Sequence, residues 1–268
     1  MAAPIFILAG EPSGDRLGAS LMRAITTRYG KKRWIGTGGP AMREQGLKSH
    51  FPMEELTVFG FGAAVKAYPR LSRRLDMLVE LIVAEKPEII VTVDAKGFAV
   101  RLAERLRRRL AGTEAPPPMI HTVAPTIWAW GHWRGNRFAH AFDGMLCLFP
   151  FEPDYLLPLG LDARFISHPE AFNPAYDVVG HAAGLPATDA LPQLTLLPGS
   201  RRSELDHLLD PMLAAISMLR DDMPDLTVQL PTLPHLVDRI SASIAASGLG
   251  DTITVRSDEG GLFDALAG

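Results

Sequence analysis

Short runs of consecutive apolar residues alternate along the chain with longer segments whose apolar residues recur at helical spacing. The first run covers residues 5–8, and four apolar residues in a row are typical of a strand that is buried on both faces of a parallel sheet. Further runs begin near positions 33, 89, 119, 145 and 164. Strands that alternate with helices in this way predict an α/β fold with a doubly wound parallel sheet.

A second copy of this pattern begins after residues 171–193, a stretch rich in proline and glycine that we interpret as a linker. After a strand and a glycine turn at 194–199, two more strands are predicted at 226–230 and 252–255, with a helix at 235–247 between them. We therefore predict a Rossmann-like domain over residues 1–170 and a partial Rossmann-like domain over residues 194–268. Its sheet would be incomplete, because a unit of this kind usually has more strands.

The composition limits the classes of function. With a net charge of −3, the chain lacks the basic character of a general nucleic-acid binder, so we expect no nucleic-acid partner. Cys147 is the single cysteine, which excludes an internal disulfide and a cysteine-based zinc site and fits a reducing compartment. No signal peptide is visible, and no window has the ~18 consecutive apolar residues that a spanning helix needs. We expect a soluble or peripheral protein.

The turn after the first strand is a candidate binding corner. Gly10 and Gly14 interrupt the apolar run, and the segment that follows has its apolar residues on one helical face. Ser13 or Asp15 is expected to cap this helix. A helix N-terminus exposes backbone N–H groups that suit a sugar, a phosphate or a carboxylate, and the alternative is a turn without a ligand.

Two further features fall at the carboxyl ends of predicted strands, where ligands bind in open α/β sheets. Asp94 ends the strand at 89–93, and its carboxylate can act as a base, hold a sugar hydroxyl or cap the next helix. After the strand at 119–123, three of the four tryptophans fall within residues 128–133. Because a core does not normally collect tryptophans beside proline and glycine, this loop predicts an aromatic wall around a ligand or a partner contact.

An apolar stretch over residues 56–65 is followed at once by basic residues. These are Lys66, Arg70, Arg73 and Arg74. Apolar side chains among acyl chains, with cations that meet anionic head groups, are typical of a peripheral membrane contact. The alternative is a core helix with a solvated basic end, because most stretches of this kind belong to the core. The apolar spacing that follows predicts a helix over residues 75–85.

A candidate anion site opens the second half. There a strand runs into Gly199, Ser200 and Arg201 and then into a predicted helix. A guanidinium beside a helix N-terminus can hold a diphosphate by paired hydrogen bonds. Ser203 and Asp206 have the spacing of a capping box for this helix. The alternative interpretation is a solvated pair of arginines.

Short motifs in order along the whole chain resemble those of lipid-A-disaccharide synthase. They are Ala-Gly-Glu-Pro-Ser-Gly-Asp at 9–15, Gly-Gly-Pro-Ala-Met at 38–42, Met-Glu-Glu-Leu at 53–56, Val-Asp-Ala at 93–95, Ala-Pro-Thr-Ile-Trp-Ala-Trp at 124–130, Phe-Pro-Phe-Glu at 149–152, His-Pro at 168–169 and Leu-Leu-Pro-Gly-Ser-Arg at 196–201. No single motif is decisive, but their common order argues against chance.

The resemblance implies a GT-B glycosyltransferase with two Rossmann-like halves. Such an enzyme joins the sugar of UDP-2,3-diacylglucosamine to 2,3-diacylglucosamine 1-phosphate, called lipid X, and gives lipid A disaccharide 1-phosphate and UDP. The resemblance also implies that the enzyme needs no metal or cofactor and forms a homodimer at full length. It would act on lipid substrates as a peripheral protein on the cytoplasmic face of the inner membrane.

Residue roles follow from the same resemblance. Asp94 is expected to be the base toward the acceptor hydroxyl, and Arg201 is expected to stabilise the leaving diphosphate. The other residues expected to bind substrate, in the acceptor pocket, the cleft or the nucleotide loop, are Glu11, Ser13, Gly14, Asp15, Trp128, Trp130, Glu152, His168, Gly199 and Ser200. Those expected to contact acyl chains or the membrane are Val58, Phe59, Phe61 and Val65.

Three departures from the family pattern are visible. Lys96 and Gly97 follow Asp94-Ala95 where the family has a sequence closer to Asp-Ala-Pro-Asp-Phe, so a second carboxylate is missing and a lysine has entered. Ser167 stands where a glycine is usual. The chain also ends before the family's Gly-Thr-x-x-x-Glu segment at the donor nucleotide, so we expect a C-terminally truncated member with weak UDP binding.

Two rival interpretations remain open. One is a truncated or degenerate homologue without catalysis that binds lipid or a partner. The other is a different UDP-sugar enzyme of the GT-B type. A dinucleotide oxidoreductase is disfavoured, because the turn from Gly10 to Gly14 lacks the Gly-x-Gly-x-x-Gly spacing.

Overall fold

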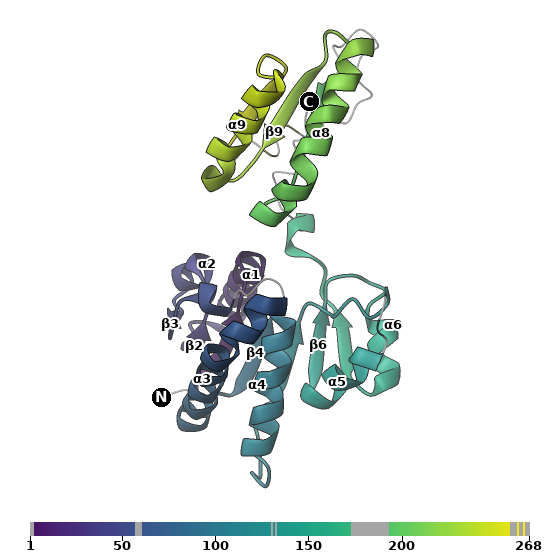
Figure 1. Cartoon of the computed structure of the whole chain (residues 1–268). Coiled ribbons are helices and arrows are strands. Elements are labelled where there is room, and N and C mark those ends of the chain that lie inside the picture. Colours follow the sequence, from purple (N-terminus) through teal and green to yellow (C-terminus); the bar gives the residue numbers. More distant parts are fainter. Residues whose placement is uncertain are drawn as a thin grey trace. The chain divides into compact units, whose positions relative to one another are not determined.

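The computed structural model describes residues 3–56, 61–129, 131, 133–172, 193–257, 262 and 265, with only the backbone described at 61–67. The chain divides into two compact units, Met1–Pro169 and Glu170–Gly268 (Figure 1). Every helix within the described part is too short or too polar to span a bilayer.

The first unit alternates strands and helices. Its strands are β1 (Ile5–Ala9), β2 (Trp34–Thr37), β3 (Lys48–Ser49), β4 (Ile89–Val93), β5 (Met119–Thr122), β6 (Gly144–Cys147) and β7 (Asp162–Phe165). Its α-helices are α1 (Pro12–Tyr29), α2 (Pro40–Glu44), α3 (Phe61–Glu85), α4 (Lys96–Arg109), α5 (Trp133–Ala141) and α6 (Pro153–Leu156). Short 3₁₀ turns cover Met53–Leu56 and Leu157–Leu159, and a third, Pro169–Phe172, begins at the last residue of this unit.

The strands form one parallel sheet. As far as the structure describes it, this sheet has seven strands in the order β3-β2-β1-β4-β5-β6-β7. The order reverses between β1 and β4, which pair directly from Ile5 against Ile89 to Ala9 against Val93. In a doubly wound sheet this reversal opens a crevice at the carboxyl ends of the two strands, so it marks the default ligand site.

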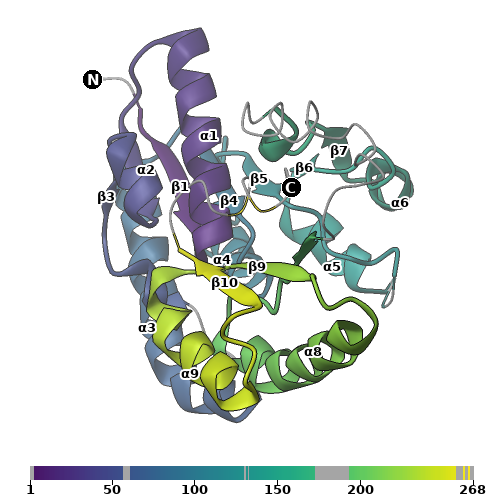
Figure 2. The same ribbon diagram turned by 90° about the horizontal axis from the view of Figure 1, so that it is seen from above.

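Alternate residues of β1 face two different cores. Phe6 and Leu8 pack with apolar residues of α3, α4 and α5, whereas Ile5, Ile7 and Ala9 pack with those of α1 and α2. The helices therefore cover both faces of the sheet, as Figures 1 and 2 show. Because both faces are covered, β1 can be continuously apolar, and the prediction of a doubly wound sheet is confirmed.

Two elements differ from the sequence prediction. The strand β3 was missed because Lys48 and Ser49 are polar and too few to show a pattern. Helix α3 begins at Phe61 rather than near residue 75 and continues through Pro69. Its face at Leu75 and Leu78 packs against the sheet, and this tertiary contact outweighs the unfavourable local signals of glycine and proline.

Asp15 has a different partner from the one expected. The N-cap of α1 is Glu11, without a side-chain cap, so the prediction that Ser13 or Asp15 caps this helix is wrong. The buried Asp15 carboxylate instead accepts hydrogen bonds from the backbone N–H groups of Gly39, Ala41 and Met42, at 2.8, 2.9 and 3.1 Å. Asp15 therefore caps α2 from the neighbouring helix.

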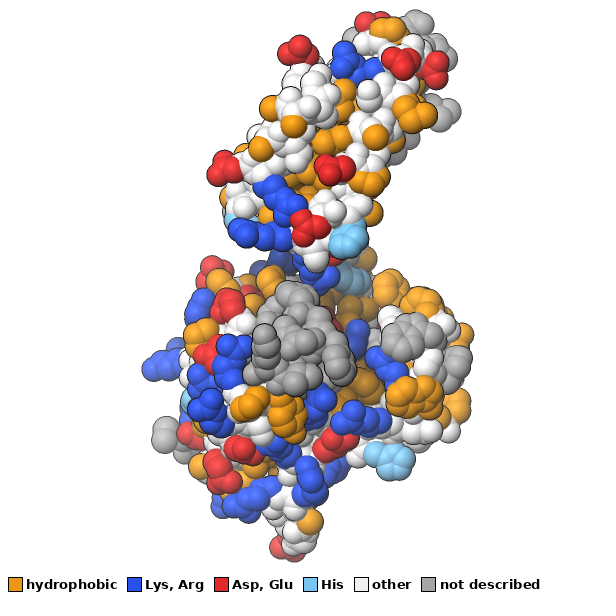
Figure 3. Space-filling view, viewed as in Figure 1, with side chains coloured by type: hydrophobic (Ala, Val, Ile, Leu, Met, Phe, Trp, Pro, Cys, Tyr) orange, Lys and Arg blue, Asp and Glu red, His pale blue; other side chains and the backbone are white. Residues whose placement is uncertain are grey.

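Basic side chains gather on the face of the first unit formed by α3 and α4, with acidic side chains among them (Figure 3). Arg70, Arg73, Arg101 and Arg108 are all exposed there. The basic outer face of α4 is thus solvated.

The second unit contains β8 (Gln193–Thr195), α8 (Arg202–Asp222), β9 (Thr227–Pro231), α9 (Val237–Ser247) and β10 (Ile253–Arg256), with a 3₁₀ turn at Pro234–Leu236. Within the described residues, its parallel sheet has three strands in the order β10-β9-β8. Helices α8 and α9 pack side by side, and their apolar faces meet the strands in one core (Figure 2).

His121 is a buried polar residue in the core of the first unit. Its Nδ1 lies 2.7 Å from the Thr92 hydroxyl, and its ring stacks on Phe142 with 4.9 Å between centroids. Burial lowers the pKa of His121 from 6.5 to about 3, and the charge of Lys96 acts in the same direction. The imidazole is therefore neutral in the folded protein at pH 7, and protonation of the unfolded chain opposes folding as the pH falls.

We expect the free energy of unfolding of the first unit to fall by about 1.4 kcal/mol for each pH unit below 6.5 through His121 alone. The loss would continue toward pH 3, because only the unfolded chain binds this proton in that window. His121→Leu should remove this contribution. The measurement is urea unfolding between pH 7 and pH 4 followed by tryptophan fluorescence, since all four tryptophans belong to the first unit.

His140→Leu at an exposed position of α5 is the matched control and should keep the wild-type slope. Equal slopes for wild type and His121→Leu would show that His121 does not drive the pH dependence.

Candidate functional site

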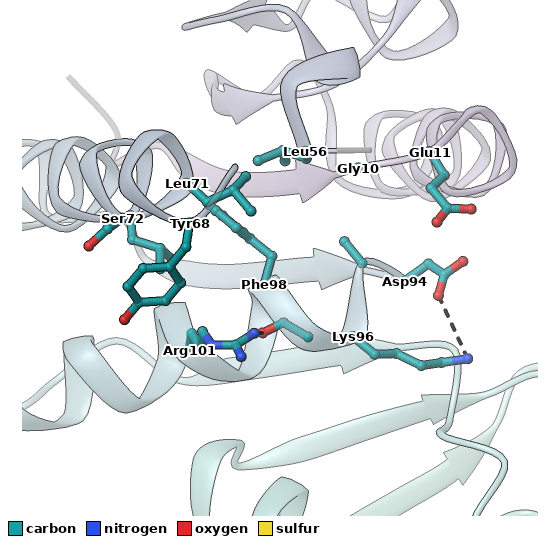
Figure 4. A pocket seen from close by; sticks show the side chains of 13 residues that line it. Gly10, Glu11, Leu56, Tyr68, Leu71, Ser72, Asp94, Lys96, Phe98 and Arg101 are labelled. Carbon is teal, nitrogen blue, oxygen red and sulfur yellow. Dashed lines mark hydrogen bonds and ion pairs between the residues drawn. The ribbon is translucent and has the colours of Figure 1, made fainter. Parts of the chain in front are cut away.

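A pocket of about 380 Å³ lies at the point where the strand order reverses. It is lined by Gly10, Glu11, Leu56, Tyr68, Leu71, Ser72, Leu75, Asp94, Ala95, Lys96, Gly97, Phe98 and Arg101. The residues come from the turns after β1 and β4, from the 3₁₀ turn that ends at Leu56, and from α3 and α4 (Figure 4). Two of the predicted site residues, Glu11 and Asp94, therefore share one opening at the carboxyl edge of the sheet.

The backbone that carries Asp94 into this pocket has an unusual conformation. Its N–H donates to Thr122 O at 3.0 Å, which continues the pairing of β4 with β5. Asp94 and Ala95 then both adopt left-handed conformations, with φ of 51° and 46°. Ala95 is the N-cap of α4, so Asp94 does not cap this helix. Strain of this kind costs about 1–3 kcal/mol per residue and is typical of functional sites.

Gly10 and Gly14 allow the two turns to approach each other. A Cβ at Gly10 would lie 2.8 Å from Cβ of Ala95, closer than real Cβ contacts allow. A Cβ at Gly14 would lie 3.2 Å from Val93 O and 3.5 Å from Cβ of Asp94. Gly14, predicted to bind substrate, thus supports the position of Asp94.

The polar end of the pocket carries both signs of charge. Lys96 Nζ lies 3.7 Å from Asp94 Oδ1, and the two side chains are 29% and 25% exposed. Arg101 donates from Nη1 to Gly97 O at 3.0 Å. Figure 4 shows the Glu11 and Asp94 carboxylates near each other, with Lys96 extended toward Asp94. Arg101 is a site residue that the sequence did not reveal, because its helix is basic along its whole outer face.

The other walls of the pocket are mostly apolar. Leu56, Leu71, Leu75 and Phe98 surround its inner part, and Tyr68 stands at the side of α3 (Figure 4). Phe98 and Leu75 also belong to the core, so this wall is rigid. A ligand with an apolar portion and a charged or hydroxylated head matches this division. The predicted acyl-contact residues Val58 and Phe59, and the side chains of Phe61 and Val65, lie outside the described residues.

Several predicted site residues surround the ends of β6 and β7 instead. The buried Glu152 accepts hydrogen bonds from the N–H groups of Leu148 and Phe149, at 2.9 and 3.0 Å, and thereby closes the turn after β6. The half-exposed Trp128 meets the Phe151 ring edge-on at 5.3 Å. His168 follows Ser167, whose φ of 68° explains why glycine suits that position. Trp130 lies outside the described residues.

In the second unit, the predicted anion site already contains an internal anion. Glu204 Oε2 accepts hydrogen bonds from the N–H groups of Ser200 and Arg201, at 2.8 and 3.1 Å. Arg201 Nη1 also lies 3.3 Å from Glu204 Oε1. A Cβ at Gly199 would lie 2.5 Å from Glu204 Oε2, so only glycine leaves room for this arrangement.

The capping box of α8 is therefore formed by Arg201 and Glu204, and the prediction that Ser203 and Asp206 form it is wrong. The hydrogen bond from Ser200 is the main reason that the pKa of Glu204 lies below its usual value; the Arg201 backbone and guanidinium add to it. The sequence missed Glu204, although Glu three residues after the N-cap is the usual signal.

A search of the described residues finds no group of three or more His, Cys, Asp or Glu side chains that could hold a metal ion. Asp94 belongs to the first unit, and Arg201 belongs to the second.

Comparisons with known proteins agree with the family that the motifs indicated. A sequence model described as lipid-A-disaccharide synthetase matches residues 5–254. The chain is 41% identical over 247 residues to the lipid-A-disaccharide synthase of Rhodospirillum centenum, which covers 90% of this chain and 60% of the relative. It is 36% identical over 244 residues to that of Ruegeria pomeroyi, with 90% and 59% covered. The chain thus spans about three fifths of these relatives.

A solved structure supports the fold independently. A putative UDP-N-acetylglucosamine 2-epimerase from Listeria monocytogenes superposes with a TM-score of 0.59 at 13% identity, covering 96% of this chain and 70% of that one. At this identity the likeness concerns the GT-B fold alone. On the family match, the chain belongs to the lipid-A-disaccharide synthetase family.

Proposed function

We propose that the protein joins the sugar of UDP-2,3-diacylglucosamine to 2,3-diacylglucosamine 1-phosphate, called lipid X, and releases UDP. The names of its relatives point to this reaction. The observation that carries the proposal is the pocket at the switch point, where the Asp94 carboxylate meets an apolar wall. A sugar hydroxyl near Asp94, with an acyl chain along Leu71 and Phe98, fits this pocket.

In the proposed reaction, the acceptor hydroxyl attacks the anomeric carbon of the donor. Asp94 takes the hydroxyl proton while the new carbon–oxygen bond forms. The bond between the anomeric carbon and the diphosphate breaks, and its electron pair leaves with UDP. Partial exposure leaves Asp94 accessible to a substrate, and its strained backbone fixes its direction.

Arg201 and the start of α8 are proposed to stabilise the charge that develops on the leaving diphosphate. In this structure the Glu204 carboxylate accepts hydrogen bonds from the N–H groups of Ser200 and Arg201. A diphosphate that uses these groups has to displace the Glu204 carboxylate. Glu204 therefore competes with the diphosphate for these N–H groups.

The acylated substrates imply a lipid surface. Arg101 lines the pocket, and Arg70 and Arg73 are exposed residues of α3. Basic side chains gather on the α3–α4 face (Figure 3) and can meet anionic head groups. We propose a peripheral protein on the cytoplasmic face of the inner membrane that needs no metal and forms a homodimer at full length. The direct test of the function is UDP release by the protein, which should require lipid X as well as the donor. Release without lipid X would indicate a different UDP-sugar enzyme.

Asp94→Asn should lower kcat by roughly a hundredfold or more, because the amide has the same shape but cannot accept the proton. Affinity for the UDP-sugar should change little, since the proposed role concerns the acceptor. Steady-state kinetics with both substrates and equilibrium binding of the donor provide the measurement. Asp222→Asn, at an exposed carboxylate at the end of α8, is the control. Unchanged kcat would remove Asp94 from the mechanism.

Glu204→Gln should tighten binding of UDP by roughly threefold or more, because the glutamine oxygen can still accept the two N–H groups but no longer repels a diphosphate. Calorimetric titration with UDP measures the change. Asp210→Asn, at an exposed position of the same helix, should leave the affinity unaltered. Weaker binding in Glu204→Gln would show that Glu204 assists the ligand instead of competing with it.

A further inference from the structure

Lys96 is placed to contact both Asp94 and a ligand in the pocket. It is the first residue of α4, and its ammonium extends along the pocket toward Asp94 (Figure 4). The separation of 3.7 Å between Nζ and Oδ1 is longer than a hydrogen bond, so the pair is held by Coulomb attraction alone. Both side chains are partly exposed, and pairs of this kind contribute little stability.

The charges around Lys96 favour a new partner. Among the described residues, Asp94 is the ion-pair partner that the structure gives to Lys96. Arg101 is the other cation among the described residues that line the pocket, and it donates a hydrogen bond to the backbone of its own helix at Gly97. Lys96 therefore has unused N–H donors at the polar end of a pocket whose other walls are mostly apolar. A phosphate group accepts several charge-assisted hydrogen bonds from an ammonium and binds it more strongly than a distant carboxylate does.

We propose that Lys96 recognises the phosphate of an acylated sugar phosphate in this pocket, and that it leaves Asp94 for that phosphate when the ligand binds. The identification of this ligand as the acceptor rests on the proposed function. The apolar wall at Leu71, Leu75 and Phe98 receives an acyl chain, and Lys96 receives the phosphate at the polar end. Glu11 and Asp94 remain on the side where a sugar hydroxyl enters.

This exchange of partners means that ligand binding frees the Asp94 carboxylate from Lys96. In this structure the Lys96 ammonium lies 3.7 Å from one carboxylate oxygen of Asp94. Once Lys96 has moved to the phosphate, the carboxylate can accept a hydrogen bond from the sugar hydroxyl. Lys96 is thus a positioning residue toward Asp94 and a specificity-determining residue toward the phosphate.

The test is equilibrium binding to the full chain in the absence of UDP-sugar. Three ligands separate the chemical groups: a short-chain 2,3-diacylglucosamine 1-phosphate below its micelle concentration, the same molecule without phosphate, and glucosamine 1-phosphate without acyl chains. Wild type should prefer the first over each of the others by roughly tenfold. Lys96→Met should reduce the preference for phosphate to below about threefold and leave the affinity for the phosphate-free lipid unchanged.

Lys96→Arg should keep most of the phosphate preference, and Lys31→Met, which removes an exposed lysine before β2, should behave as wild type. A full phosphate preference in Lys96→Met would overturn the proposal. So would an equal loss for both lipids, which is the signature of a structural role. Equally tight binding of glucosamine 1-phosphate would exclude the acyl contribution.

The exchange of partners is tested by adding Asp94→Asn. Asp94→Asn should strengthen binding of the acylated phosphate more in a protein that has Lys96 than in one that carries Lys96→Met. The reason is that only the lysine has to leave Asp94 before it can bind the phosphate. Equal strengthening would refute the exchange. Since no transfer takes place in this experiment, a protein that shows the expected binding but releases no UDP would refute the proposed function and leave this inference standing.

Discussion

The close approach of the turns after β1 and β4 is the constraint on which the candidate site depends. The absence of a side chain at Gly10 lets Ala95 pack against the first turn, and Asp94 and Ala95 accept left-handed backbone conformations there. Such strain persists only where the surroundings over-determine it. Here β4 is paired on both sides, with β1 and with β5, and apolar cores cover both faces of the sheet. The stability of the sheet thus fixes the direction of one carboxylate.

Most of the fold could be predicted because its long elements repeat one simple pattern. Apolar runs mark β1 and β4 since both faces of these strands are buried. The pattern fails where an element is too short or is stabilised from a distance. The two polar residues of β3 gain their place only by pairing with β2, and the first turns of α3 contain glycine and proline. Contacts with distant segments stabilise both elements, and such contacts cannot be seen in a short window of sequence.

For the candidate site, the sequence predicted the position of Asp94 but not the contacts that other site residues make. The position of Asp94 follows from the topology, because the order of the strands alone puts the end of β4 at the switch point. No knowledge of side-chain contacts is needed for that prediction. The partner of Asp15 lies 24 residues or more along the chain, at the start of α2. Arg101 looked like every other arginine of a solvated helix face. Glu204 was the exception, since its spacing from Arg201 could have been read as a capping box if arginine were an expected N-cap.

Backbone hydrogen bonds distinguish three acidic residues, Asp15, Glu152 and Glu204, from Asp94. Asp15, Glu152 and Glu204 each accept two or more backbone N–H groups, so adding a proton to their bonded oxygens would break contacts that hold a helix start or a turn. Asp94 faces a single ammonium at a distance beyond hydrogen bonding, in a pocket that admits water. A substrate can therefore approach the Asp94 carboxylate without breaking a backbone hydrogen bond. Among these four carboxylates, Asp94 is the one whose partner, the Lys96 ammonium, can leave without the loss of a backbone hydrogen bond that holds a helix start or a turn.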